Sequence, residues 1–136
     1  MLDNTKKLSP NEYSPLALAF LGDGVYEQCA RYYVISQGNC PQGKLHKKNT
    51  TLVCAAFQSK AYFILEPYLT EDEIAVLHRG RNATSNHTPK HSGAIEYRHA
   101  TAVETLFGYL KLLNKTDRIN QLFDIIIKES TDLLEG

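Results

Sequence analysis

Two carboxylate residues stand in stretches that are otherwise apolar, and they are the side chains most able to do chemistry. Asp23 follows the apolar run LALAFL and has a glycine on each side, in LAFLGDGVYE. Glu104 lies in the apolar stretch TAVETLFGYL. An isolated acid in such a position is ordinarily a surface group or one member of a structural ion pair. Two acids held close together without a basic partner repel each other, and a hard divalent cation such as Mg²⁺ relieves that repulsion through oxygen ligands.

Small residues surround both acids, and this predicts that the helices carrying them approach each other closely. These residues are Gly22, Gly24, Ala100, Ala102 and Gly108. A glycine inside a helix costs about 1 kcal/mol relative to alanine, so glycines kept at these positions indicate a need for space. We therefore expect the segments around Asp23 and Glu104 to pack together and to bring the two carboxylates close to each other.

Apolar residues recur with helical spacing along almost the whole chain, and no stretch shows the alternation of a strand. We therefore predict an all-α fold in a single domain spanning residues 1–136. Ser14 followed by Pro15 marks one helix start, and the capping box from Thr70 to Glu73 marks another. Residues 82–94 are polar and rich in turn formers, so we expect an exposed loop there. The expected helices cover 15–36, about 44–60 with a short helix or continuation through 62–68, 70–80, 95–113, and about 116 onward.

Charge is balanced overall, with 15 basic and 15 acidic residues, but it is distributed unevenly. No acid occurs between Glu27 and Glu66 or between Glu73 and Glu96, and both intervals contain basic residues and histidines. The acids gather instead at 66–73 and near the C-terminus. Such segregation can give a neutral protein a basic face that binds nucleic acid, and a solvated surface of mixed charge is the alternative.

The sequence indicates neither a membrane span nor a signal peptide. No run approaches the ~18 consecutive apolar residues that a membrane span needs. The N-terminus, MLDNTKKLSPNEY, lacks the apolar core of a signal peptide. The three cysteines show no CxxC spacing and fit free thiols in a reducing compartment. We therefore expect a cytoplasmic protein that does not bind a membrane.

The two acidic motifs resemble those of a known enzyme family. LAFLGDGVYE is similar to the signature of ribonuclease III, the endonucleases that cut double-stranded RNA, and TAVETLFGYL resembles the family's second motif. The short length and the stretches LHKKNT and HRGRNATS resemble the small branch named Mini-ribonuclease III. The resemblance extends from Ser14 to about Leu113 and implies the helical fold of the ribonuclease III endonuclease domain.

The resemblance also implies roles for the two acids. Asp23 matches the catalytic aspartate and Glu104 the metal-binding glutamate, so both are candidate catalytic residues and candidate ligands of Mg²⁺. Longer ribonuclease III enzymes have two further acids where this chain has Ala19 and Thr101, which leaves open whether one or two ions bind. Glu27, four residues after Asp23, is either a third ligand or an ordinary exposed glutamate. We assign none of the histidines to a metal.

The activity that the resemblance implies is Mg²⁺-dependent hydrolysis of double-stranded RNA to 5′-phosphate and 3′-hydroxyl products. It further implies maturation of the 23S ribosomal RNA precursor at its paired ends. It also implies a homodimer with Phe20 at or near the interface, and we expect no DNA substrate. With no separate RNA-binding domain in the sequence, specificity would need RNA structure or a partner protein, such as a ribosomal protein. A non-catalytic RNA-binding or ribosome-associated module and a helical adaptor that never meets RNA are the alternatives.

Basic and polar residues of the two acid-free intervals, together with one arginine near the second motif, are the candidates for RNA contacts. Each of them is alternatively a solvated surface group. They are Lys44, His46, Lys47, Lys48, Arg79, Arg81, Asn82, Lys90 and Arg98.

Overall fold

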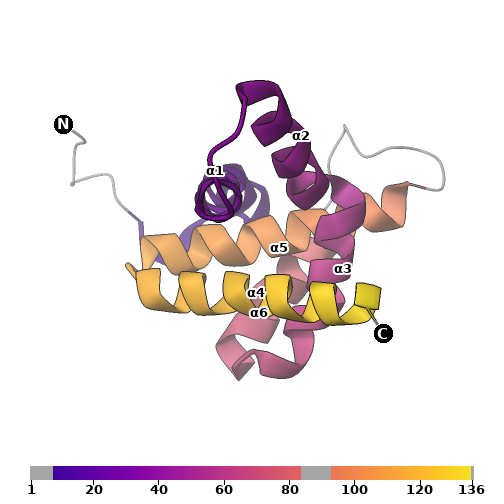
Figure 1. Cartoon of the computed structure of the whole chain (residues 1–136). Coiled ribbons are helices and arrows are strands. Elements are labelled where there is room, and N and C mark those ends of the chain that lie inside the picture. Colours follow the sequence, from indigo (N-terminus) through magenta and orange to yellow (C-terminus); the bar gives the residue numbers. More distant parts are fainter. Residues whose placement is uncertain (1–7, 84–92, 136) are drawn as a thin grey trace.

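The computed structural model describes residues 8–83 and 93–135, and every regular element in these ranges is a helix (Figure 1). The predicted all-α fold is confirmed. Two short 3₁₀ helices, η2 and η3, accompany six α-helices. The elements are η2 (Pro10–Glu12), α1 (Pro15–Ser36), α2 (Gln42–Val53), α3 (Ala55–Leu65), η3 (Glu66–Tyr68), α4 (Glu71–Asn82), α5 (Ala94–Leu112) and α6 (Thr116–Glu135).

The helix starts with strong local signals lie where the sequence predicts them. Ser14 caps α1, since its hydroxyl accepts a hydrogen bond from the backbone N–H of Ala17 at 3.2 Å. Thr70 and Glu73 form both hydrogen bonds of the capping box that begins α4. That helix continues two residues beyond Gly80, the residue at which we expected it to end.

The predicted helix over 44–60 is wrong, because the chain breaks at Cys54. This residue is extended, with φ −72° and ψ 156°, and separates α2 from α3. The break lets the two halves pack on different partners, α2 on α1 and α3 on α5. At the end of α2 the hydroxyl of Tyr26 donates to the backbone carbonyl of Leu52 at 2.7 Å, which ties α2 to α1. Tertiary packing therefore overrides a continuous apolar stripe.

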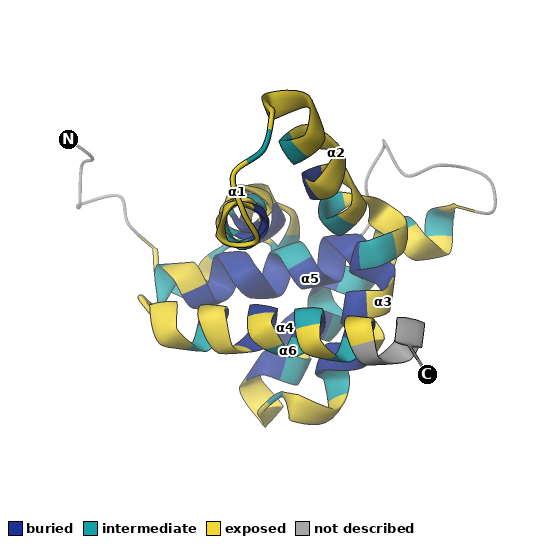
Figure 2. Ribbon diagram, viewed as in Figure 1, coloured by how far each residue is buried: buried dark blue, intermediate teal, exposed yellow. Residues whose placement is uncertain are grey.

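Helix α5 runs through the middle of the molecule, with α1, α3, α4 and α6 packed around it (Figure 1). Its central part is buried on nearly all sides (Figure 2). Tyr26 of α1 places its ring edge-on against Phe107 of α5 and Phe123 of α6, with ring centroids 5.4 and 5.5 Å apart. Among the residues that the structure describes, no helix is both long enough and apolar enough to cross a membrane.

An ion pair with little solvent exposure ties α6 to α4. Arg118 donates from Nε and from one terminal nitrogen to the carboxylate of Glu73, at 2.9 and 2.7 Å, and also to the carbonyl of Tyr68. Burial alone would raise the pKa of Glu73, but hydrogen bonds from Arg118 and from the Thr70 backbone lower it below its ordinary value. The acid that caps α4 thus also holds the C-terminal helix.

Candidate active site

Two glycines allow the backbones of α1 and α5 to touch. A Cβ atom added to Gly22 would lie 1.6 Å from the carbonyl oxygen of Glu104, and one added to Gly108 would lie 1.9 Å from that of Leu18. The expected close approach of the two helices is therefore present. Gly24 has no such role, since a Cβ atom there would meet nothing within 4 Å.

This contact brings Asp23 and Glu104 together, as the sequence predicts. Asp23 is exposed on α1 and Glu104 is half-buried on α5. Burial, followed by the neighbouring Asp23 carboxylate, raises the pKa of Glu104 to about 8. Neither acid belongs to an ion pair within the described part of the chain. The pair is thus a concentration of negative charge without a basic partner, which holds a proton or attracts a cation.

A third side chain touches this pair from α3. Gln58 is buried, and its Nε2 donates to Oε2 of Glu104 at 3.5 Å. Sequence reasoning missed this residue, because one glutamine in a helix carries no recognisable pattern.

The donor set at the pair fits a hard cation. Both ligand side chains offer carboxylate oxygens, and Mg²⁺ binds through one or two carboxylates while keeping several waters. Over residues 8–83 and 93–135, no group of three His, Cys, Asp or Glu side chains gathers around a possible metal position. Ala19 and Thr101 are both buried and supply no acid. Any ion at this site would therefore depend on Asp23 and Glu104 for its acidic ligands.

Glu27 is occupied elsewhere. Its carboxylate accepts hydrogen bonds from Nε of Arg31 at 3.1 Å and from the amide of the buried Asn49 on α2. The side chain is only half-buried, and it joins α1 to α2. This arrangement accounts for Glu27 without a metal ion.

His99, which we assigned to no metal, contacts a serine hydroxyl and two aromatic rings. Its Nδ1 is 3.3 Å from Oγ of Ser59, and its ring packs on Tyr62 and Phe63 with centroids 4.4 and 4.7 Å away. Burial, followed by the charge of Arg81, lowers the pKa of this histidine.

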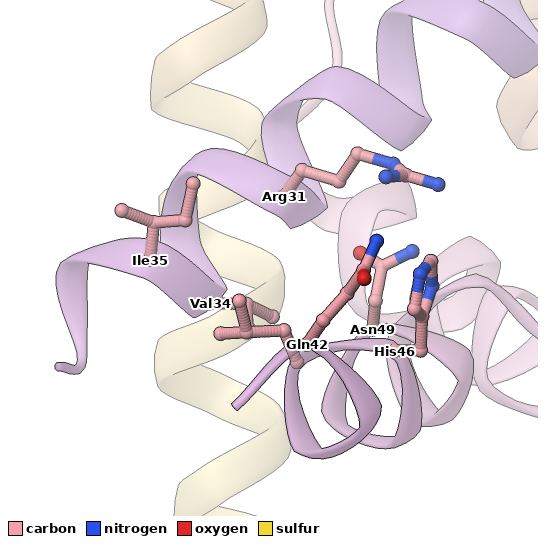
Figure 3. A pocket seen from close by; sticks show the side chains of 7 residues that line it. Arg31, Val34, Ile35, Gln42, His46 and Asn49 are labelled. Carbon is pink, nitrogen blue, oxygen red and sulfur yellow. The ribbon is translucent and has the colours of Figure 1, made fainter. Parts of the chain in front are cut away.

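The basic group on α2 lies at the surface. Lys44, His46, Lys47 and Lys48 are all exposed. His46 also lines a pocket of about 200 Å³ between α1 and α2, whose other walls include the side chains shown in Figure 3. These four residues are therefore accessible to a ligand.

The remaining RNA-contact candidates are placed less uniformly. Arg79 is half-buried and donates to the carbonyl of Tyr13 at 3.3 Å, so part of its role is structural. Arg81 donates to the hydroxyl of Tyr62 at 3.0 Å and to the side chain of Asn82 at 3.1 Å. Asn82 and Arg98 are exposed, and Lys90 lies outside the described residues.

Phe20 points into solvent from α1. Its side chain is 86% exposed, the largest exposure among the large apolar residues of the described chain. Leu16, Tyr32 and Ile35 on the same helix are exposed as well. Helix α1 thus carries one acid of the pair, Asp23, together with several exposed apolar side chains.

Comparison with known proteins identifies the family of this chain. The Ribonuclease III domain model matches residues 16–115. A protein named Mini-ribonuclease 3 from Brevibacillus brevis is 42% identical, over 93% of this chain and 92% of its own length. Another of that name from Clostridium tetani is 44% identical, over 85% of this chain and 78% of its own. A crystal structure of a Fusobacterium nucleatum protein superimposes with a TM-score of 0.80 at 31% identity, covering 91% of this chain and 99% of that one. The chain belongs to the ribonuclease III family, in its Mini-ribonuclease III branch.

Proposed function

We propose that this ribonuclease III-type endoribonuclease hydrolyses paired RNA with the help of Mg²⁺ held by Asp23 and Glu104. The observation that carries the proposal is the pair of carboxylates at the α1–α5 contact, which has no ion-pair partner among the described residues. Asp23 belongs to the first motif and Glu104 to the second. The site therefore forms only when the chain folds and brings the two motifs together.

Each acid has a distinct part in the reaction. When bound, Mg²⁺ lowers the pKa of a water ligand and offsets the charge that develops on the phosphate. Asp23 is exposed, so its carboxylate is accessible to an RNA phosphate. Glu104, with its pKa raised to about 8, holds a proton at neutral pH and must release it before it can act as a ligand. The products are a 5′-phosphate and a 3′-hydroxyl.

The exposed basic residues of α2, with Arg98, supply contacts to the RNA backbone. Paired RNA is recognised mainly by its shape, through phosphates and 2′-hydroxyls. Lys44, His46, Lys47 and Lys48 are accessible for such contacts. Arg79, Arg81 and Asn82 contribute where their existing hydrogen bonds leave a donor free, and Lys90 belongs to the same proposed set.

A second copy of the chain covers the apolar surface of α1. Phe20, Leu16, Tyr32 and Ile35 are exposed large apolar side chains on α1, and an isologous dimer would bury the same side chains on both copies. A dimer also places one acid pair on each strand of the RNA duplex. We further propose that the substrate is the paired precursor of 23S ribosomal RNA in the cytoplasm, with a ribosomal protein assisting recognition.

The test is Asp23→Asn, with Asp124→Asn, an exposed aspartate on α6, as the matched control. We expect Asp23→Asn to abolish Mg²⁺-dependent cleavage of a paired precursor stem, as measured by gel electrophoresis of the products. Binding of the same RNA in EDTA should stay unchanged, and the control should cleave normally. Mg²⁺-independent cleavage by the wild type, or full activity of the variant, would overturn the proposal. Binding without cleavage by the wild type would favour a non-catalytic RNA-binding module.

A further inference from the structure

Gln58 is a buried polar residue whose side chain reaches the carboxylate pair. It lies on α3 and is 3% exposed, and its Nε2 donates to Oε2 of Glu104 at 3.5 Å. Helix α3 packs along α5, and the next residue, Ser59, contacts His99 five residues before Glu104. The α3–α5 contact thus delivers one amide to the site and directs the neighbouring hydroxyl away from it.

The chemistry of the two groups fixes the direction of this hydrogen bond when Glu104 is ionised, which is the form that binds a metal ion. An ionised carboxylate only accepts, whereas an amide side chain offers both a donor and an acceptor. The nitrogen of Gln58 must therefore face the ionised Glu104, because the reverse orientation would place two acceptors against each other. With Oε2 engaged, the carboxylate is restricted in rotation, and its other oxygen stays free of Gln58.

A site with two acids depends strongly on how each acid is oriented. No third His, Cys, Asp or Glu in the described chain joins Asp23 and Glu104. Glu104 is half-buried on a helix that is fixed by backbone contact with α1, yet its side chain retains rotatable bonds. Hydrogen bonds to a ligating side chain commonly change metal affinity by about 10- to 100-fold.

We propose that Gln58 is a positioning residue that holds the carboxylate of Glu104 in the orientation that binds Mg²⁺. The inference rests on the proposed function, since it presumes that the two acids hold a divalent cation. Gln58 itself contacts neither RNA nor the reacting atoms in this role. It acts through Glu104, so its removal weakens metal binding before it affects the chemical step.

The experiment measures Mn²⁺ binding to the full chain without RNA, by electron paramagnetic resonance. Gln58→Met keeps a side chain of similar length and removes the donor, and Gln58→Leu is the second variant if the first does not fold. Ser59→Ala is the matched control, because Ser59 is the buried neighbour that bonds to His99 instead of Glu104. Unfolding temperatures in EDTA establish that the compared proteins are folded.

We expect about a 10-fold weaker Mn²⁺ affinity for Gln58→Met and an unchanged affinity for Ser59→Ala. Cleavage of paired RNA by Gln58→Met should recover as the Mg²⁺ concentration is raised about 10-fold, which a general loss of packing would not produce. Equal Mn²⁺ affinity in wild type and Gln58→Met overturns the role of Gln58 and leaves the proposed function intact. Equal weakening by Ser59→Ala also overturns it, since α3 packing then explains the effect. A wild type that binds no Mn²⁺ overturns the proposed metal site itself.

Discussion

Glu104→Gln should make the metal-free protein more stable while removing its activity. The carboxylate of Glu104 is half-buried beside Asp23, and its ionisation is unfavourable in the folded state. A neutral amide of the same size avoids both the loss of hydration and the repulsion. We therefore predict that replacing this proposed catalytic residue increases the free energy of unfolding, whereas most substitutions decrease it.

The size of the effect follows from the pKa of Glu104, which rises from an ordinary value of 4.5 to about 8. One pKa unit corresponds to about 1.4 kcal/mol, so the upper limit is about 5 kcal/mol above pH 8. Water and side-chain relaxation at a half-buried site reduce this, and we expect about 2–3 kcal/mol. Because the folded-state pKa of Glu104 is raised, ionisation of this residue does not affect the stability of the wild type below pH 4.5. It lowers that stability as the pH rises towards 8. The advantage of the variant grows over the same interval.

Thermal unfolding of both proteins, followed by circular dichroism at equal concentration in EDTA, measures this advantage. At pH 8.5 we expect Glu104→Gln to unfold about 6–12 °C higher than the wild type, and at pH 5.5 the difference should be much smaller. Added Mg²⁺ should then raise the unfolding temperature of the wild type and leave the variant nearly unchanged. An equal or lower unfolding temperature for the variant at pH 8.5 in EDTA would refute the reasoning, because it would show that ionisation of Glu104 does not destabilise the folded state.

Four further substitutions test the packing and the proposed dimer. Gly22→Ala should lower the free energy of unfolding in urea by at least about 3 kcal/mol, because α1 and α5 must separate. Gly24→Ala should raise it by up to about 1 kcal/mol through better helix propensity. Similar values for the two variants would contradict the backbone contact. Arg118→Ala should lower the free energy of unfolding by about 3 kcal/mol at neutral pH, because it leaves Glu73 unpaired. Unfolding measured at neutral and at acidic pH should show a smaller loss in acid, where that carboxylate is protonated. Phe20→Glu should convert a dimer into a folded monomer in light scattering, and an unchanged dimer would exclude this surface as the interface.

The local chemistry of the chain predicts the helix starts because their signals act over three or four residues. Ser14 with Pro15, and Thr70 with Glu73, satisfy backbone groups of their own first turn, so no distant contact is needed to read them. The break at Cys54 has no such signal. Apolar residues continue with helical spacing on both sides of it, and the choice between one helix and two depends on α1 and α5, which are distant in sequence.

The two acids of the candidate site are predictable because each contradicts its apolar surroundings. Gln58 is not predictable, because a glutamine is unremarkable in a helix and its importance arises only from a contact 46 residues away. Sequence spacing also leaves Glu27 unresolved. Its position four residues after Asp23 suits a ligand, but a hydrogen bond from Asn49, 22 residues further along, engages its carboxylate.

The contact between α1 and α5 explains how two repelling acids remain adjacent in the absence of a cation. A side chain at Gly22 would strike the backbone carbonyl of Glu104. This contact therefore holds the backbone of Glu104 against Gly22, the residue that precedes Asp23. Repulsion can therefore be relieved by protonation or by side-chain rotation, but not by separating the helices. Burial and the charge of Asp23 raise the pKa of Glu104, which makes protonation easier, and the hydrogen bond from Gln58 opposes rotation. A divalent cation would be the remaining means of relief, and from the proposed function we expect it to bind more tightly as the pH rises towards 8, because the competing proton is then lost.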